Sequence, residues 1–254
     1  MRRCLWVFAL LLMSVPAALA EELPLIDGHI HYSHDNWERL PPEKAVAILR
    51  AAGLKRALVS SSSDEGTQML YRVAPELIVP VLRPYRKRGE TGSWFTDETV
   101  PAMMSARLAK YKYAGLGEFH IDGIEAETEV MRAVVQMARK HGLFLHSHSD
   151  AAAVHEIFQQ DPEALVLWAH AGFEPLDVVR NMLSLYENLW ADLSFRSPAD
   201  GTGRVKPAWR ALFTDYPDRF ILGTDTYTPS RWGYVGAYAA EARVWLGDLP
   251  EGLA

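Results

Sequence analysis

Hydrophobic and polar positions alternate in a regular order along the chain from Leu23 onward. Short apolar runs of strand length are each followed by a stretch in which apolar residues recur with helical spacing. This order is typical of strand–helix units that build a parallel sheet. Eight runs are predicted as strands: Leu23–His29, Arg56–Ser61, Leu77–Leu82, Tyr113–Phe119, Leu143–His146, Ala164–His170, Leu189–Ser194 and Arg219–Thr224.

The segments between these runs carry the helical signal. Apolar residues between 45 and 52 recur at i, i+3, i+4 and i+7, and Gly53 follows them as a stop signal. The same spacing recurs over 130–138, with Gly142 just beyond it, and over 178–186. Two long loops are predicted, Arg83–Thr99 and Arg196–Lys206.

Eight strands that are each followed by a helix predict a single-domain (β/α)8 TIM barrel over residues 21–254. The alternative is an open doubly wound sheet, which often carries a glycine-rich phosphate loop after its first strand. Here the first strand runs into Asp27-Gly28-His29-Ile30-His31, which contains no such loop. The sequence therefore favours the barrel.

The first 20 residues form a separate segment with the pattern of a signal peptide. Arg2 and Arg3 precede the apolar run Cys4–Leu12, and Ala18-Leu19-Ala20 matches a cleavage site. The alternative is an uncleaved membrane anchor, but the apolar run is short for a membrane span. We therefore expect cleavage after Ala20 and a periplasmic or secreted protein.

Removing this segment changes the charge and the cysteine content. Without Arg2 and Arg3, 24 basic residues stand against 32 acidic ones, which gives a formal charge of −8. That balance argues against nucleic acid as a partner. Cys4 is the only cysteine, so the mature chain is expected to have neither a disulfide nor a thiol ligand. We expect no membrane partner after cleavage, and the oligomeric state stays open.

Residues capable of binding a metal collect at the ends of the predicted strands. The carboxyl ends of barrel strands form the active-site face of this fold. The residues at or just after strand ends are His29, His31, Glu118, His120, His146, His148, His170 and Asp225.

The pair His29 and His31 is the strongest single signal. Residues two apart on a strand point to the same side, so both imidazoles are placed to share one cation. The structural alternative is a pair of hydrogen-bonded polar residues at the barrel rim. His146 and His148 repeat the spacing on the fifth strand, where His146 is favoured as a ligand and His148 as a substrate contact or a helix cap.

Three further residues extend this set. His170 ends the apolar run 165–169 and is a candidate ligand and catalytic residue. Asp225 follows the eighth strand, beside the first in a closed barrel, where a carboxylate can bind metal and accept a proton from water; its alternative is a helix cap or turn residue. Glu118 is favoured as a bridge between two cations over a salt-bridged rim carboxylate.

This set resembles the metal-dependent amidohydrolase superfamily. The segments Ile26–His31, Leu167–Gly172 and Gly223–Asp225 are similar to the amidohydrolase-related (amidohydrolase 2) branch, and Glu118 resembles the strand-four glutamate of TatD-type deoxyribonucleases. The resemblance implies one or two divalent ions, zinc first, with manganese, iron or magnesium as alternatives. It implies a first metal on His29, His31 and Asp225, a second on His146 and His170, and Glu118 as the bridge.

The chain departs from this family at its C-terminal end. Family members usually finish with an amphipathic helix after a Leu-Pro segment, whereas here Leu249-Pro250 is followed by only four residues. We therefore expect either a truncated chain or no closing helix, with the outer wall over the first and eighth strands less well covered.

The resemblance and the ligand set predict a hydrolase that uses a metal-activated water, with Asp225 moving the proton. The expected substrate is a small molecule with an amide, ester, lactone or phosphoester bond. The alternatives are a metal-dependent decarboxylase of an aromatic or related acid, which needs one metal, and a non-catalytic periplasmic binding barrel. Arginines near strand ends suit an anionic substrate, with surface charge as their alternative; they are Arg83, Arg86, Arg196 and Arg231.

Overall fold

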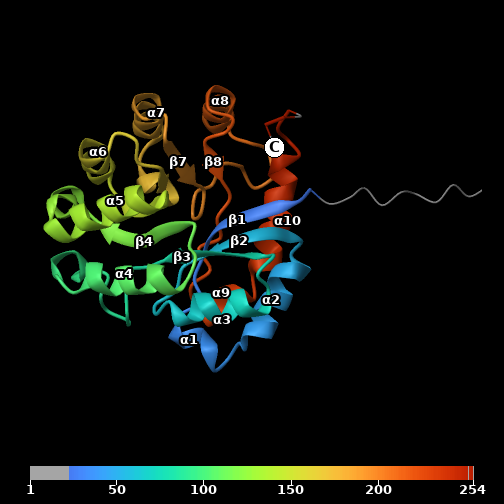
Figure 1. The fold of residues 1–254 in the computed structure, drawn as a ribbon. Helices are drawn as coiled ribbons and strands as arrows, with labels where there is room; N and C mark the ends of the chain where they lie inside the picture. Colours follow the sequence, from blue (N-terminus) through green and yellow to red (C-terminus); the bar gives the residue numbers. More distant parts are fainter. Residues whose placement is uncertain (1–22, 251, 254) are drawn as a thin grey trace, which may run out of the picture.

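The computed structural model describes residues 23–250 and 252–253, and these fold into a barrel of eight parallel strands in chain order (Figure 1). Each strand overlaps one of the predicted runs, so the predicted fold class is confirmed. The strands are β1 (Leu25–Ile30), β2 (Leu54–Val59), β3 (Ile78–Leu82), β4 (Gly115–Ile121), β5 (Phe144–Ser149), β6 (Val166–Trp168), β7 (Leu189–Asp192) and β8 (Phe220–Ile221).

The barrel closes between β8 and β1 through a short set of hydrogen bonds. The Gly28 N–H donates to the Leu222 carbonyl at 2.7 Å, and the His31 N–H donates to the Thr226 carbonyl at 2.8 Å. A parallel bridge joins Ile30 to Thr226. This closure brings the segment after β8 beside the end of β1, as the sequence predicts for Asp225.

Helices surround the strands on the outside (Figure 1). The predicted helix over 130–138 is the middle of α5, where the Thr128 hydroxyl accepts from the Met131 N–H and Gly142 ends the helix with φ 64°. The helices are α1 (His34–Trp37), α2 (Pro42–Ala51), α3 (Glu65–Val73), α4 (Val100–Lys110), α5 (Glu129–His141), α6 (Ala151–Gln160), α7 (Leu176–Leu185), α8 (Pro207–Asp215), α9 (Pro229–Trp232) and α10 (Val235–Leu246), with 3-10 turns η1 (Trp94–Thr96), η2 (Gly123–Glu127) and η3 (Ala169–Phe173).

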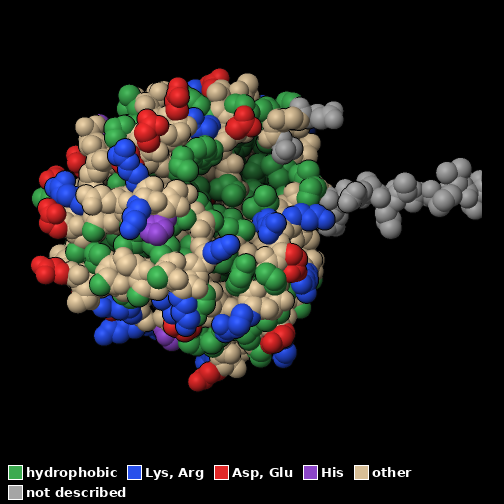
Figure 2. All heavy atoms as spheres, viewed as in Figure 1, with side chains coloured by type: hydrophobic (Ala, Val, Ile, Leu, Met, Phe, Trp, Pro, Cys, Tyr) green, Lys and Arg blue, Asp and Glu red, His purple; other side chains and the backbone are tan. Residues whose placement is uncertain are grey.

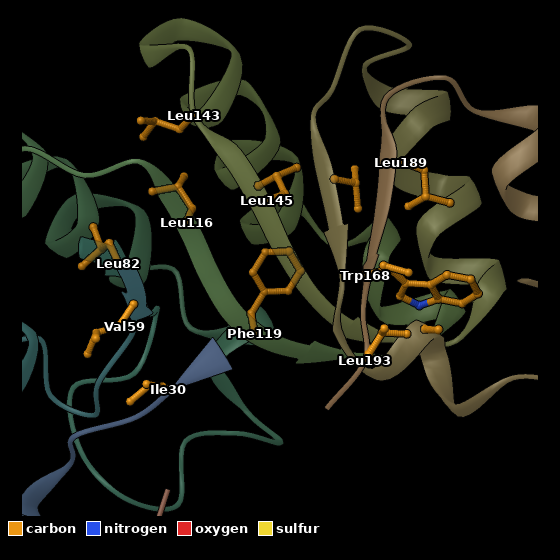
Figure 3. Close-up of a cluster of buried hydrophobic side chains, with 14 of the residues drawn as sticks. Ile30, Val59, Leu82, Leu116, Phe119, Leu143, Leu145, Trp168, Leu189 and Leu193 are labelled. Atoms are coloured by element: carbon orange, nitrogen blue, oxygen red, sulfur yellow. The ribbon is translucent and has the colours of Figure 1, made fainter. Parts of the chain in front are cut away.

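The core lies between the strands and the surrounding helices (Figure 3). Leu116, Leu145 and Leu189 come from β4, β5 and β7 and are fully buried. Phe119 and Trp168 add large rings near the carboxyl ends of β4 and β6, and both are fully buried as well. Each such side chain contributes about 1.5–3 kcal/mol of hydrophobic free energy. This packing holds the strand ends, and therefore the groups after them, in fixed positions.

The outer wall over β1 and β8 is partly uncovered. Helix α10 lies against α2, where Arg243 donates to the carbonyls of Leu23 and Ala52, and Ile26 on β1 stays 45% exposed. Two cavities of about 460 and 410 Å³ lie against these strands, and hydrophobic side chains line the hollow (Figure 2). Both cavities are lined by Leu25, Ile26, Leu193, Leu222 and Trp245. The expectation of a less well covered wall agrees with this arrangement.

The predicted signal peptide, residues 1–20, lies outside the described residues. Within the part of the chain that the structure describes, no helix combines the length and the apolar character needed to cross a bilayer. The predicted loop Arg83–Thr99 contains only the short turn η1, and Arg86 ties it together by contacts with Glu90 and Asp97.

Candidate metal centre

The carboxyl ends of four strands deliver five of the predicted ligands to one side of the barrel. His29 lies on β1 and His31 directly follows that strand. Glu118 lies on β4, His170 lies in η3 after β6, and Asp225 follows β8. All five residues are at most 8% exposed. Groups that are up to 196 positions apart in the sequence therefore meet in a buried site.

His29, His31, Glu118 and Asp225 form a compact cluster of four groups. The Nε2 atoms of His29 and His31 are 3.0 Å apart. Glu118 oxygens lie 3.3 Å from His29 Nε2 and 3.2 Å from His31 Nε2, and Asp225 Oδ1 lies 3.5 and 3.2 Å from the same nitrogens. Ligand atoms about 2.0–2.1 Å from a tetrahedral zinc ion stand about 3.3 Å from one another. The cluster therefore has the spacing of a ligand set.

The other ring nitrogen of each histidine faces an oxygen, which sets the tautomer. His31 Nδ1 lies 2.6 Å from the Ser60 carbonyl, and His170 Nδ1 lies 3.0 Å from the Ser194 carbonyl. A carbonyl can only accept, so these Nδ1 atoms carry the proton. His29 Nδ1 lies 3.0 Å from the carboxylate of Asp192. The Nε2 atoms of all three rings consequently face the cluster, where each can bind a proton or a metal ion, as in metal-binding histidines.

Negative charge in the cluster favours a cation between the two imidazoles of β1. Burial acts to lower the pKa of His29, but the charges of Glu118, Asp192 and Asp225 outweigh it and hold this pKa well above its usual value. Burial likewise acts to raise the pKa of Asp225, yet the positive charge of His29 and the hydrogen bond from His31 lower it to about 2. In both cases the surroundings stabilise positive charge at the position where a metal ion would lie.

The donor set fits a divalent metal ion. His29, His31 and Asp225 form one group of potential ligands, and His29, Glu118 and His170 form another that overlaps it. Two imidazole lone pairs 3.0 Å apart repel each other unless a proton or a metal ion lies between them. Nitrogen and carboxylate ligands at this spacing suit zinc best, while manganese and iron are tolerated.

His146 does not join this cluster. Its Nε2 lies 3.2 Å from Asp192 Oδ2, and its ring packs edge-on against His29 with the centroids 4.6 Å apart. Burial lowers the pKa of His146 to about 4, so the ring is neutral at pH 7. The groups of potential ligands among the described residues do not place His146 with Glu118 or His170. His146 instead shares a group of potential ligands with His29 and Asp192.

Glu118 is held by two donors besides the imidazoles of the cluster. Arg83 donates through Nη2 to Oε2 at 2.7 Å and through Nε to the Glu118 carbonyl at 3.0 Å. His148 Nδ1 lies 2.8 Å from Oε1, and its side chain is 30% exposed. Burial acts to raise the pKa of Glu118, but His29 and the hydrogen bonds from histidines hold it well below its usual value. Glu118 is therefore ionised, and His148 is its partly exposed neighbour.

Sequence reasoning missed Asp192, which ends β7 and is fully buried. Its carboxylate contacts His29 Nδ1, His146 Nε2 and the Ser194 N–H. Burial acts to raise its pKa, but His29 and these hydrogen bonds hold it well below the usual value. The available signal was a carboxylate at the end of the apolar run Leu189–Ala191. His120, which the sequence also places at a strand end, stacks on His148 with the ring centroids 4.1 Å apart.

Replacing Asp192 tests its role in orienting His29. Asp192→Asn keeps the shape of the side chain but removes the charge that holds the His29 ring with Nε2 toward the cluster. Loss of such a supporting carboxylate costs about 10- to 100-fold in metal affinity. We expect that loss for zinc in competition with a chelator of known affinity. Asp218→Asn, on the exposed surface, is the control; an Asp192→Asn affinity within twofold of the control would contradict the assignment.

The arginines predicted to bind substrate are each engaged by the protein. Arg83 pairs with Glu118, and Arg86 contacts Glu90, Asp97 and Thr99. Arg196 donates to the carbonyls of His170 at 3.1 Å and Glu174 at 2.7 Å. Arg231 donates to the carbonyls of Asp225 at 2.9 Å and Thr224 at 2.6 Å. These contacts give the guanidinium groups a structural role at the rim, so the prediction of an anionic substrate gains no support from them.

Backbone strain is concentrated around the site. The five non-glycine residues with positive φ in the described chain all follow β6, β7 or β8. Such a conformation costs about 1–2 kcal/mol for each residue with a side chain. Gly172, with φ 62°, completes the turn after β6, where an added Cβ would come within 2.2 Å of the Trp168 ring. The five residues are His170, Ala171, Phe173, Phe195 and Asp225.

Comparison with known proteins supports the fold and leaves the family open. No protein-family model matches the chain, and no curated protein matches it. A solved TIM-barrel protein of Bordetella bronchiseptica is 12% identical with a TM-score of 0.60, over 90% of this chain and 92% of that one.

Two further solved structures carry described activities. A protein of Pseudomonas putida described as a 2-pyrone-4,6-dicarboxylic acid hydrolase is 14% identical with a TM-score of 0.56, over 86% of this chain and 89% of that one. The N-isopropylammelide isopropylaminohydrolase of Burkholderia multivorans is 14% identical with a TM-score of 0.54, over 91% and 73% of the two chains. At these identities the likeness shows that the chain shares the TIM-barrel fold.

Proposed function

We propose that this protein is a metal-dependent hydrolase of a small molecule. The proposal rests above all on one observation: His29, His31, Glu118 and Asp225 converge with atoms 3.0–3.5 Å apart at the strand ends of the barrel. A barrel without metal chemistry has no physical reason to bury two carboxylates and two imidazoles so close together.

The residues at the cluster have different proposed roles. A divalent ion bound there supplies a water of pKa about 7 and polarises the oxygen of the bond to be cleaved. Asp225 is ionised and its Oδ2 lies 3.9 Å from His170 Nε2, so it is placed to take a proton on the side that His170 faces. His170 is neutral because burial lowers its pKa. His148, partly exposed beside Glu118, is the natural contact for the substrate.

The comparisons support this proposal at the level of chemistry class. Two of the solved barrels that share the fold are described as hydrolases: a 2-pyrone-4,6-dicarboxylic acid hydrolase and an N-isopropylammelide isopropylaminohydrolase. Hydrolysis at a metal site in this fold is compatible with an amide, ester, lactone or phosphoester bond. We take zinc as the first metal to test, because imidazole nitrogens and carboxylate oxygens at tetrahedral spacing suit it.

The second candidate is a metal-dependent decarboxylase. One observation favours it: His146 Nε2 lies 3.2 Å from Asp192 Oδ2, and among the described residues His146 shares no group of potential ligands with Glu118 or His170. A single ion serves a decarboxylase of an aromatic acid as well as a hydrolase. The ligand cluster fits both activities, so the hydrolase and the decarboxylase are distinguished by their reaction products.

The test is a comparison of metal-free and metal-loaded protein against a small substrate panel. The protein is stripped with a chelator, reloaded with zinc or manganese, and assayed with an ester, a lactone, an amide, a phosphodiester and an aromatic acid. We expect hydrolysis of at least one substrate that is lost on stripping and restored by metal. Carbon dioxide release from the aromatic acid alone would replace the hydrolase by the decarboxylase. A protein without bound metal and without thermal stabilisation by added metal would indicate a binding barrel.

A further inference from the structure

We infer that two exposed phenylalanines, Phe173 and Phe195, form an aromatic rim that binds a flat, unsaturated ring of the substrate beside the metal centre. The inference rests on the proposed function in that the bound ring belongs to the molecule that reaches the cluster. It adds a substrate class and two specificity-determining residues.

The aromatic rim lies directly on the site. The Phe173 ring stacks on the His170 ring with the centroids 4.5 Å apart and the planes 17° from parallel. The His170 ring in turn stacks on His29 at 5.1 Å and 29°. Phe195 contacts His170 from another direction, with its centroid at 5.6 Å and the planes at 47°. A column of rings thus runs from the surface at Phe173 to the cluster at His29.

Both rings are left in contact with solvent. Phe173 is 55% exposed and Phe195 is 49% exposed, while His170 beneath them is 1% exposed. Single exposed apolar side chains are common on protein surfaces and need no explanation. Two half-exposed rings that follow neighbouring strands and lie against one buried histidine of the centre make a local apolar patch beside His170 instead.

The backbone holds these rings in place at a cost. His170, Ala171, Gly172 and Phe173 have φ values of 56°, 49°, 62° and 54°, which form a left-handed turn. Successive residues of this turn bring Phe173 back over His170. Phe195 also has positive φ, 57°. Glycine adopts these conformations freely, whereas phenylalanine does so with strain. Strained residues that persist at a site are a pointer to function when the ring has little burial to gain.

The support behind Phe195 is rigid. The Arg231 guanidinium lies 4.4 Å over the Phe195 ring, and its nitrogens donate to the carbonyls of Thr224 and Asp225. Arg231 is also 5.6 Å from the ring of Tyr227, which is 46% exposed. The face of Phe195 is therefore fixed relative to the backbone of Asp225. A ring that leans on Phe173 or Phe195 lies next to the groups that carry the proposed chemistry.

The surroundings of Arg83 are polar. A cavity of about 220 Å³ beside Arg83, the partner of Glu118, is lined by Arg83, Tyr85 and Lys87, among others. Because the arginines near the site are engaged by protein acceptors, the part of the substrate against the aromatic rim is recognised by its apolar face. The fitting ligand has a flat unsaturated ring at one end and the polar, reactive group at the other.

The test uses equilibrium binding, so that it does not depend on turnover. Benzamide and cyclohexanecarboxamide have the same polar group on a flat and a puckered ring. Their dissociation constants are measured by titration with metal-free and with zinc-loaded protein. A face-to-face or edge contact between aromatic rings is worth about 0.5–1.5 kcal/mol beyond buried area, which is about a two- to tenfold preference. We expect benzamide to bind two- to tenfold more tightly to wild type, and the preference to fall to about one in Phe173→Ala and Phe195→Ala.

Two further variants serve as controls, one for the loss of any exposed apolar side chain and one for backbone strain at Phe173. Leu185→Ala removes a 58% exposed apolar side chain at the end of α7 and should leave the preference unchanged. Phe173→Gly relieves the positive φ, so it should be at least as stable to urea as Phe173→Ala and should still lose the preference. No binding of benzamide, no preference in wild type, or a preference that survives in both alanine variants would overturn the inference. A preference that persists in a protein without hydrolase activity would uphold the aromatic rim and reject the proposed function.

Discussion

His31→Ala is expected to abolish tight metal binding and to reduce turnover by more than 100-fold. His31 gives the cluster an Nε2 lone pair 3.0 Å from that of His29 and 3.2 Å from Asp225 Oδ1. Removing a residue that supports a metal ligand lowers metal affinity or activity about 10- to 100-fold, and removing a direct ligand lowers them further. Metal content after gel filtration and the rate on the best substrate of the panel are the two measurements.

The control for this variant is His141→Ala, which removes an exposed imidazole at the end of α5. It should keep the metal content and the rate of wild type. Far-ultraviolet circular dichroism checks that His31→Ala still folds, because the ring also donates to the Ser60 carbonyl. A folded His31→Ala protein that retains both its metal and its activity would refute the assignment of the site.

Arg83→Met is expected to destabilise the metal-free protein by about 3 kcal/mol, because it leaves the buried Glu118 carboxylate without its guanidinium partner. The Arg83 and Glu118 side chains are 9% and 3% exposed, so water replaces little of the lost contact. Bound metal supplies positive charge at the same cluster, so we expect a smaller loss in the metal-loaded protein. Urea denaturation of both forms gives the two free energies of unfolding.

The matched control is Arg180→Met, which breaks an ion pair with Asp215 on the surface. Those side chains are 42% and 51% exposed, and such pairs contribute about 0–1 kcal/mol. If Arg83→Met costs no more than Arg180→Met in the metal-free protein, Glu118 does not depend on Arg83. An equal loss with and without metal would show that the metal does not bind near Glu118.

The fold could be predicted because its signals are local and repeated. The continuous apolar runs of β4 and β5 are easily told from the helically spaced apolar residues of α5. The same difference between strand and helix recurs in each strand–helix unit. The positions of His29, His31, Glu118, His170 and Asp225 at strand ends followed from the same pattern, since the barrel brings all carboxyl ends to one face.

What the sequence could not show is which partner each side chain takes. His146 lies on β5 as predicted, but its ring faces Asp192, a residue of β7 that follows it by 46 positions. Arg83 and Arg196 were predicted at the mouth of the site, yet one pairs with Glu118 and the other with backbone carbonyls after β6. These contacts depend on side-chain directions across the barrel, and spacing along one strand carries no information about them.

The sequence did not predict the left-handed turn after β6 either. The segment Ala169–Phe173 contains one glycine, and the positive φ of His170, Ala171 and Phe173 runs against the ordinary preference of those residues. The packing of Gly172 on Trp168 and the hydrogen bond from His170 to the Ser194 carbonyl are tertiary contacts. They override the local preference at the place where the site is built.

Anomalous X-ray diffraction from crystals grown with zinc tests the metal centre most directly. We predict one strong peak per chain about 2.0–2.2 Å from His29 Nε2, His31 Nε2 and a carboxylate oxygen of Asp225. A second peak, between His146 and His170, would restore the two-metal site that the resemblance implies. Crystals soaked in zinc that show no peak at His29 and His31 would contradict the central claim.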